Sequence, residues 1–179
     1  MTQETIALFY RRRRPGEESG ALLLRALRRY APGVPFSPTR TAAGRPVPGG
    51  GVHASITHSG AFWLCALARQ PVGVDLQIHR ARRPAALSRR YFHPEEDAFL
   101  RRQGGRDFFT VWAAKESYVK WTGRGLGQGL ATFSTVEGGA ICGRRLGVQL
   151  RPLPFAPGYS LCLCARRVGA VAYLSLEEE

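Results

Sequence analysis

Glu116 lies directly after Lys115 and four residues before Lys120, and these two are the only lysines among the 26 lysine and arginine residues of the chain. Arginine occupies every other strongly basic position. A compact, rotatable ammonium group is not equivalent to a planar guanidinium group. Two lysines within six residues, next to a carboxylate, therefore indicate that the amine itself is needed here.

Asp75 and Gln77 form a second candidate group. They alternate with Val74, Leu76 and Ile78, so a strand would place the acid and the amide together on one face and the apolar side chains on the other. A carboxylate and an amide side by side are oxygen ligands of the kind that a hard cation takes. The alternative is an ordinary half-exposed strand.

The polar residues Thr57, His58 and Ser59 stand where a short strand expected at 53–57 ends, before a second, apolar strand expected at 61–68. A turn between two strands at this point offers hydroxyl, imidazole and backbone N–H groups to an anion. A Ser-His hydrolase is disfavoured, because the chain has no Gly-x-Ser-x-Gly elbow and an adjacent histidine and serine need not face each other.

Residues 108–121 are predicted to form one helix with a glycine-rich exit at 122–126. At about 100° per residue, Lys115 falls inside the apolar stripe, and Glu116 and Lys120 lie on its border one turn apart. A lysine in a buried stripe needs a polar partner, because an unpaired buried charge is costly. The alternative is a surface Glu–Lys pair, with Lys115 extended to solvent. The stripe comprises Phe108, Val111, Trp112, Tyr118 and Val119, and the far side carries Thr110, Ala114, Ser117 and Trp121.

Helices and strands also alternate outside this segment. Strands are expected at 5–10, 53–57, 61–68 and 72–78, and helices at 21–30, 85–91 and 94–102. The Pro- and Gly-rich residues 33–52 predict irregular backbone. After Gly129 the pattern predicts a β-meander, with strands at 130–136, 140–150, 159–165 and 170–176.

The net charge is +13, which favours an acidic partner: a nucleic acid, a phosphorylated cofactor or an acidic protein. No apolar run approaches the ~20 residues of a membrane span. Residues 1–5 lack the basic-then-apolar order of a secretion signal, so a soluble cytoplasmic protein is expected. The four cysteines show neither disulfide nor zinc spacing, which indicates buried, reduced thiols.

Several short motifs, in this order along the chain, resemble those of the 4′-phosphopantetheinyl transferases of the surfactin-synthetase-activating (Sfp) type. The resemblance covers roughly residues 20–165. One departure is Gln77, which stands where the family usually has glutamate. The motifs are Gly44-Arg45-Pro46, Ser55-Ile56-Thr57-His58-Ser59, Gly73-Val74-Asp75-Leu76-Gln77, Trp112-Ala113-Ala114-Lys115-Glu116-Ser117-Tyr118-Val119-Lys120, Gly123-Arg124-Gly125-Leu126 and Pro157-Gly158-Tyr159.

The resemblance implies an α+β fold of two pseudo-symmetric halves with the active site in the cleft between them. Residues 1–72 would supply nucleotide and phosphate contacts, and residues 73–179 the metal and catalytic residues. The implied reaction is the Mg²⁺-dependent transfer of the 4′-phosphopantetheine group from coenzyme A to a serine of an apo acyl or peptidyl carrier protein, with adenosine 3′,5′-bisphosphate as the other product. Mn²⁺ is a second candidate metal.

The resemblance also assigns roles to residues. Glu116 and Lys120 would be catalytic, with Glu116 as the base for the serine hydroxyl and Lys120 on the diphosphate. The metal ligands would be Asp75, Glu116 and, weakly or through water, Gln77. Coenzyme A would be bound by Arg40, Arg45, Thr57, His58 and Lys115.

An acidic carrier protein, or carrier domain, is the expected partner of a monomeric enzyme. The arginine-rich segment after Ile78 is its candidate docking surface, although solvated arginine is an equally good reading of much of that charge. The docking residues would be Arg82, Arg83, Arg89, Tyr91 and Phe92.

Two alternative functions remain open at the level of sequence. A basic nucleic-acid-binding protein explains the charge but gives no role to the lysines, Asp75 or His58, and no nucleic-acid-binding motif is present. Salt-sensitive binding to duplex DNA without coenzyme A binding would favour it. The other alternative is a homologue that binds coenzyme A but turns it over weakly because of Gln77.

Overall fold

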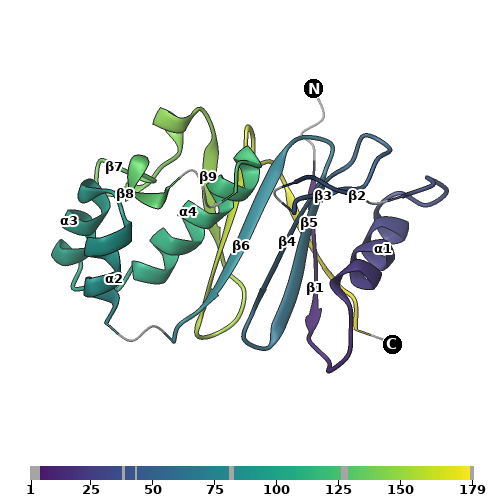
Figure 1. Cartoon of the computed structure of the whole chain (residues 1–179), viewed down its shortest axis with the longest axis horizontal. Helices are drawn as coiled ribbons and strands as arrows, with labels where there is room; N and C mark the ends of the chain where they lie inside the picture. Colours follow the sequence, from purple (N-terminus) through teal and green to yellow (C-terminus); the bar gives the residue numbers. More distant parts are fainter. Residues whose placement is uncertain (1–4, 38, 43, 81–82, 126–128, 178–179) are drawn as a thin grey trace.

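Two β-sheets face each other between flanking helices, as the ribbon of the computed structural model shows (Figure 1). The structure describes residues 5–37, 39–42, 44–80, 83–125 and 129–177. Helices and strands are both present in each half of the chain, which confirms the α+β class. The predicted docking residue Arg82 lies outside the described residues.

The first sheet has the strand order β11-β1-β5-β4. The outer face of this sheet is covered by helix α1, through Leu22, Leu23 and Leu27 packed against Phe9 and Trp63. The elements are β1 (Ile6–Arg12), α1 (Ser19–Tyr30), β4 (His53–Ser59), β5 (Phe62–Ala68) and β11 (Val171–Ser175), with the small hairpin β2 (Thr39–Arg40) and β3 (Pro46–Val47) beside them.

The second sheet has the order β6-β10-β9, with β6 (Val72–Ile78), β10 (Tyr159–Ala165) and β9 (Gln149–Leu153) all antiparallel to their neighbours. Its outer face is covered by α4 (Phe108–Thr122), and α2 (Pro84–Tyr91) and α3 (Pro94–Arg102) pack beyond that helix (Figure 1). Apolar side chains such as Leu8, Leu64, Val74 and Leu163 fill the space between the two sheets.

The predicted division at residues 72 and 73 falls at the start of β6, where the second sheet begins. The first sheet is not built from residues 1–72 alone, however. Strand β11 crosses back and pairs in parallel with β1, from Ile6 opposite Val171 to Tyr10 opposite Ser175. The C-terminal segment thereby completes the first sheet.

The meander prediction is wrong for residues 130–150. That segment contains two short 3-10 helices, Leu130–Thr132 and Arg144–Leu146, and the two-residue strands β7 (Val136–Glu137) and β8 (Ala140–Ile141). Side chains of other elements form hydrogen bonds with the backbone of this segment. Lys115 donates to the carbonyl of Phe133, and the N–H of Thr135 donates to Glu96. These groups are therefore not free to pair in a long strand.

Helix α4 is buried on more sides than the single apolar stripe predicted. Ala114 and Ser117, assigned to its far side, are fully buried against the second sheet. Gly73 of β6 makes this approach possible, because a Cβ there would collide with the carbonyl of Ser117 and lie 2.6 Å from the backbone nitrogen of Trp121. Small residues on both elements thus bring α4 directly against β6.

Candidate active site

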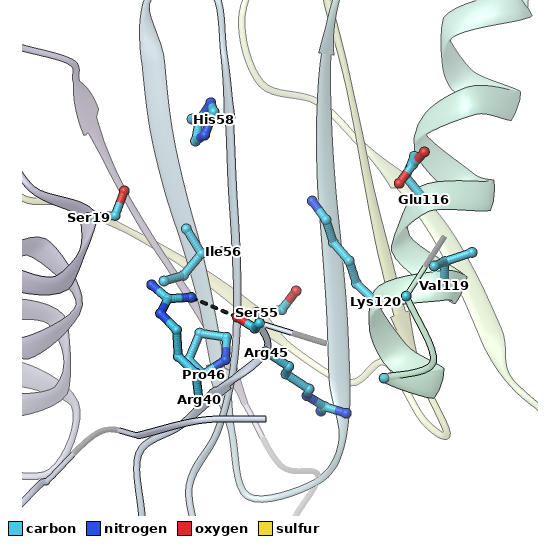
Figure 2. Close-up of a pocket in the computed structure, with 13 residues that line it drawn as sticks. Ser19, Arg40, Arg45, Pro46, Ser55, Ile56, His58, Glu116, Val119 and Lys120 are labelled. Carbon is cyan, nitrogen blue, oxygen red and sulfur yellow. Dashed lines mark hydrogen bonds between the residues drawn. The ribbon is translucent and has the colours of Figure 1, made fainter. Parts of the chain in front are cut away.

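A cleft of about 520 Å³ lies between the C-terminal half of α4 and the first sheet with its β2–β3 hairpin. In Figure 2, Lys120 and Glu116 project from α4 on one side, while Arg40, Ile56 and His58 face them from the other. The lining residues are Ser19, Arg40, Gly44, Arg45, Pro46, Ser55, Ile56, His58, Glu116, Val119, Lys120, Gly123 and Gly125.

The strands β4 and β6 meet at this cleft and are joined by side-chain hydroxyls. Ser55 accepts a hydrogen bond from the N–H of Val74 at 3.0 Å, and Ser59 accepts one from the N–H of Ile78 at 2.9 Å. Between them, Thr57 accepts the N–H of Leu76 at 3.3 Å. Each hydroxyl lies 19 residues before the N–H that it accepts, which shows that β4 and β6 run parallel. The hydroxyls satisfy N–H groups at the edge of the second sheet.

Asp75 lies beside Lys120 and is 4% exposed. The Lys120 ammonium donates to Oδ1 of Asp75 at 2.7 Å and to the carbonyl of Val74 at 3.2 Å. Thr57 donates its hydroxyl to the same Oδ1 at 3.1 Å, and Gln77 donates Nε2 to Oδ2 at 2.7 Å. The structure therefore brings Asp75, Gln77 and Lys120 together, although they come from two separate motifs.

Glu116 lies one helical turn before Lys120 and is partly buried. Burial and, secondly, the charge of Asp75 raise the pKa of its carboxyl group. The Lys120 ammonium and a hydrogen bond with Trp112 oppose that rise in pKa. A carboxylate with a raised pKa beside an ammonium group and a second carboxylate is suited to proton transfer and to cation binding.

The opposite wall of the cleft carries Arg40, Arg45 and His58. Arg40 donates to the carbonyl of Gly44 at 2.7 Å, the dashed line in Figure 2, and remains exposed. Arg45 donates to the carbonyl of Trp121 at 3.2 Å, and burial lowers the pKa of its guanidinium group. His58 lies in β4 itself and not in a turn, because that strand continues to Ser59. Arg40 and His58 thus lie across the cleft from Glu116 and Lys120, while Arg45 is turned to the C-terminal end of α4.

Two predicted coenzyme A contacts are wrong. Lys115 has no exposed surface: it forms an ion pair with Glu96 at 2.6 Å and lies over the ring of Phe133, outside the cleft. Because Lys115 lies within the apolar stripe of α4, it points toward α3, and Glu96 of α3 is its polar partner. Thr57 is 5% exposed and does not line the cleft, because its hydroxyl is held between Asp75 and Leu76.

The predicted docking residues differ in exposure. Arg83 and Arg89 are exposed at the two ends of α2, and Tyr91 is 41% exposed with Arg90 over its ring. Phe92 is 3% exposed and stacks on Phe108, so its assignment as a surface anchor is wrong. The ring of Phe92 is instead packed against Phe108 and Trp112 of α4.

Ser19 lines the cleft although no motif pointed to it. It lies at the start of α1 and reaches the cleft only because tertiary packing brings that helix there. Val119 of α4 also lines the cleft; it stands inside a recognised motif but was assigned only to the apolar stripe. Ser55 belonged to a recognised motif, and its alternation with Thr57 and Ser59 was the signal for the hydroxyl contacts with β6.

Two features can be stated for the described part of the chain. No group of three or more His, Cys, Asp or Glu side chains there is arranged to hold a metal ion by itself. None of the helices in that part is long and apolar enough to cross a membrane.

Comparison with known proteins points to one family. A family model described as the 4′-phosphopantetheinyl transferase superfamily matches residues 71–157, which include Asp75, Glu116 and Lys120. Similar proteins include a 4′-phosphopantetheinyl transferase of Bacillus subtilis, 33% identical over 89 residues (46% of this chain and 38% of that protein). The 4′-phosphopantetheinyl transferase psf-1 of Bacillus pumilus is 25% identical over 134 residues (69% and 57%).

A third relative is the 4′-phosphopantetheinyl transferase Sfp of Bacillus subtilis strain 168, 28% identical over 125 residues, or 63% of this chain and 54% of that protein. The matches thus span between 38% and 57% of the length of these three relatives.

Proposed function

We propose that this chain, which matches the family model of the 4′-phosphopantetheinyl transferase superfamily over residues 71–157, transfers the 4′-phosphopantetheine group of coenzyme A to a serine hydroxyl of an apo carrier protein. The observation that carries the proposal is the meeting of Asp75, Glu116 and Lys120 at one cleft. Transfer of a phosphoryl-linked group depends on positioning the nucleophile and neutralising charge. The two carboxylates and the ammonium group can supply both.

In the proposed step, the serine oxygen bonds to the phosphorus that carries the pantetheine arm. The bond from that phosphorus to the nucleotide's 5′-phosphate oxygen breaks, and adenosine 3′,5′-bisphosphate leaves. Glu116 accepts the serine proton directly or through a water. Its raised pKa makes it a stronger base than an exposed carboxylate. Lys120 stabilises the negative charge that develops on the leaving phosphate.

A hard divalent cation, Mg²⁺ or Mn²⁺, fits the donors of this site. Asp75 and Glu116 are two carboxylates close enough for the charge of Asp75 to raise the pKa of Glu116, and a cation between them would relieve that repulsion. One or two carboxylates completed by phosphate oxygens and water is the set that Mg²⁺ prefers. When bound, such an ion neutralises diphosphate charge.

The diphosphate and nucleotide of coenzyme A would lie along the opposite wall. Arg40, Arg45 and His58 line that wall, so their N–H groups can meet phosphate oxygens. Both walls come from one chain, which supports a monomer as the active unit.

An acidic carrier protein would dock near α2. Arg83, Arg89 and Tyr91 are exposed there, and α2 follows directly after the strand that carries Asp75. Exposed arginines attract an acidic surface and speed its approach. The docked partner would then present its serine at the end of the cleft formed by β6 and α4.

The test is to incubate the chain with coenzyme A, Mg²⁺ and several apo carrier proteins, and to weigh each carrier by mass spectrometry. One carrier should gain the mass of phosphopantetheine. Glu116→Gln and Lys120→Met should lose most of this transfer. Glu95→Gln, in α3 outside the cleft, is the matched control and should retain it. No mass gain on any carrier would overturn the proposed function.

A further inference from the structure

The carboxylate of Asp75 is held by three donors, which together occupy the atoms that a cation would need. Oδ1 receives Lys120 and Thr57, and Oδ2 receives Gln77. An oxygen of a carboxylate offers about two lone-pair sites, so Oδ1 is saturated. A divalent cation on Asp75 would also lie within a few ångströms of the Lys120 ammonium, and like charges at that range repel strongly.

Thr57 and Gln77 are poorly placed to leave Asp75. The Thr57 hydroxyl is buried and also accepts the N–H of Leu76, so rotating it away would break two hydrogen bonds. Gln77 lies two residues from Asp75 on the same face of β6, which keeps its amide beside the carboxylate. Both residues act on Asp75 from fixed strand positions.

Lys120 is the donor that can move. Its side chain is 30% exposed, it lines the cleft, and its four-carbon stem has several rotatable bonds. An anion in the cleft, such as a diphosphate, would offer its ammonium group a new partner. Withdrawal of Lys120 would free one lone-pair site of Oδ1 and remove the nearest positive charge from Asp75.

We propose that Lys120 occupies the cation's place on Asp75 until a diphosphate draws it away, while Thr57 and Gln77 act as positioning residues that keep the carboxylate aimed at the cleft. The proposal rests on the proposed function for the identity of the diphosphate as that of coenzyme A. It gives Gln77 a role distinct from that of a metal ligand. It also makes the binding of cation and diphosphate mutually dependent.

The first test measures Mn²⁺ binding to the full chain without coenzyme A, by the electron paramagnetic resonance signal of free Mn²⁺. Wild type should bind weakly, and Lys120→Met should bind about tenfold more tightly because the competing charge is gone. Arg40→Met removes the same charge from the same cleft without touching Asp75, so it is the matched control. Equal gains in both variants, or none in Lys120→Met, would overturn the proposal.

A second test uses the wild type and needs no variant to fold. The chain has only two lysines, so lysine labelled with ¹³C at Cε gives two assignable signals. Coenzyme A added with a chelator and no metal should shift the Lys120 signal and leave that of the buried Lys115 in place. A Lys120 signal that stays unchanged while coenzyme A binds would contradict the proposal.

Two substitutions of Thr57 test its role in positioning Asp75. Thr57→Ser keeps the hydroxyl on Asp75, whereas Thr57→Val removes it. In the presence of coenzyme A, Mn²⁺ should bind the serine variant as it binds wild type and the valine variant several-fold more weakly. Equal affinities would remove Thr57 from the proposal. These binding results are independent of whether any carrier gains mass, so failure of the transfer assay and failure of this inference are distinguishable.

Discussion

Lys115 and Glu96 form an ion pair of 2.6 Å in which neither side chain is exposed to solvent. The second oxygen of Glu96 accepts both the N–H and the hydroxyl of Thr135 at 2.7 Å, and Lys115 also donates to the carbonyl of Phe133. The pair therefore ties α4, α3 and the segment after Gly129 together. It fixes the rotation of α4 about its axis, which in turn directs Glu116 and Lys120 into the cleft.

Lys115→Met should destabilise the fold by about 3 kcal/mol or more, because it leaves Glu96 as an uncompensated buried charge. The double variant Lys115→Met with Glu96→Gln should recover part of this loss, since the amide still accepts from Thr135. Urea unfolding of the four proteins in the cycle measures the coupling. Additive losses would show that the two side chains are not coupled.

Gly73→Ala tests the close packing of α4 on β6. The added Cβ would meet the backbone of α4 at Ser117 and Trp121, and neither backbone can give way as a flexible side chain could. Overpacking of this kind costs about 1–3 kcal/mol. We expect a lower unfolding midpoint together with reduced transfer, because Glu116 and Lys120 move with the helix. Gly20→Ala is the control, since a Cβ there meets nothing within 4 Å.

The hydroxyl contacts between β4 and β6 predict different costs for different substitutions. Ser55→Ala leaves the buried N–H of Val74 without its acceptor, and an unsatisfied buried donor costs about 1–3 kcal/mol. Ser55→Thr retains the hydroxyl, although its extra methyl group must fit the buried site. Thermal unfolding compares the two variants. An alanine variant as stable as wild type would show that Val74 finds another acceptor.

Glu116 gives a pH dependence with a defined sign. Its pKa is raised in the folded chain, so its neutral form is favoured by folding below the ordinary carboxyl pKa, and this contribution is lost as the pH rises through the raised value. At neutral pH the charged carboxylate therefore opposes folding.

Glu116→Gln should accordingly raise the unfolding temperature at pH 7 while abolishing most transfer. The gain should shrink as the pH falls through the raised pKa and should be gone below about 4.3, the ordinary glutamate value, because the wild-type side chain is then neutral in the folded and the unfolded chain alike. A gain that does not change with pH would point to packing as its origin. Transfer by the wild type should rise with pH as Glu116 loses its proton, because the base must be deprotonated, and a bound divalent cation should move that rise to lower pH.

The sequence alone was sufficient to place the candidate site residues within their elements and to predict most of those elements. Alternation over Val72–Ile78 indicated a strand with Asp75 and Gln77 on one face, and helical phase set Glu116 and Lys120 one turn apart. These are local properties, because backbone geometry fixes side-chain direction within one strand or helix. The helix at 108–121 and the strands at 5–10, 61–68 and 72–78 agree with the structure within two residues at each end.

Only the tertiary structure decided which of those side chains face the cleft. Lys115 and Thr57 carry groups as suitable for phosphate as Lys120 and His58, yet the first is claimed by Glu96 and the second by Asp75 and Leu76. Two further long-range contacts differ from the sequence prediction. The N–H of Thr135 donates to Glu96 in place of pairing in a strand at 130–136, and β11 pairs with β1 in the first sheet. The residues that make these contacts are 18 to 165 positions apart in the sequence. The residue pattern within one helix or strand contains no information about contacts at such separations.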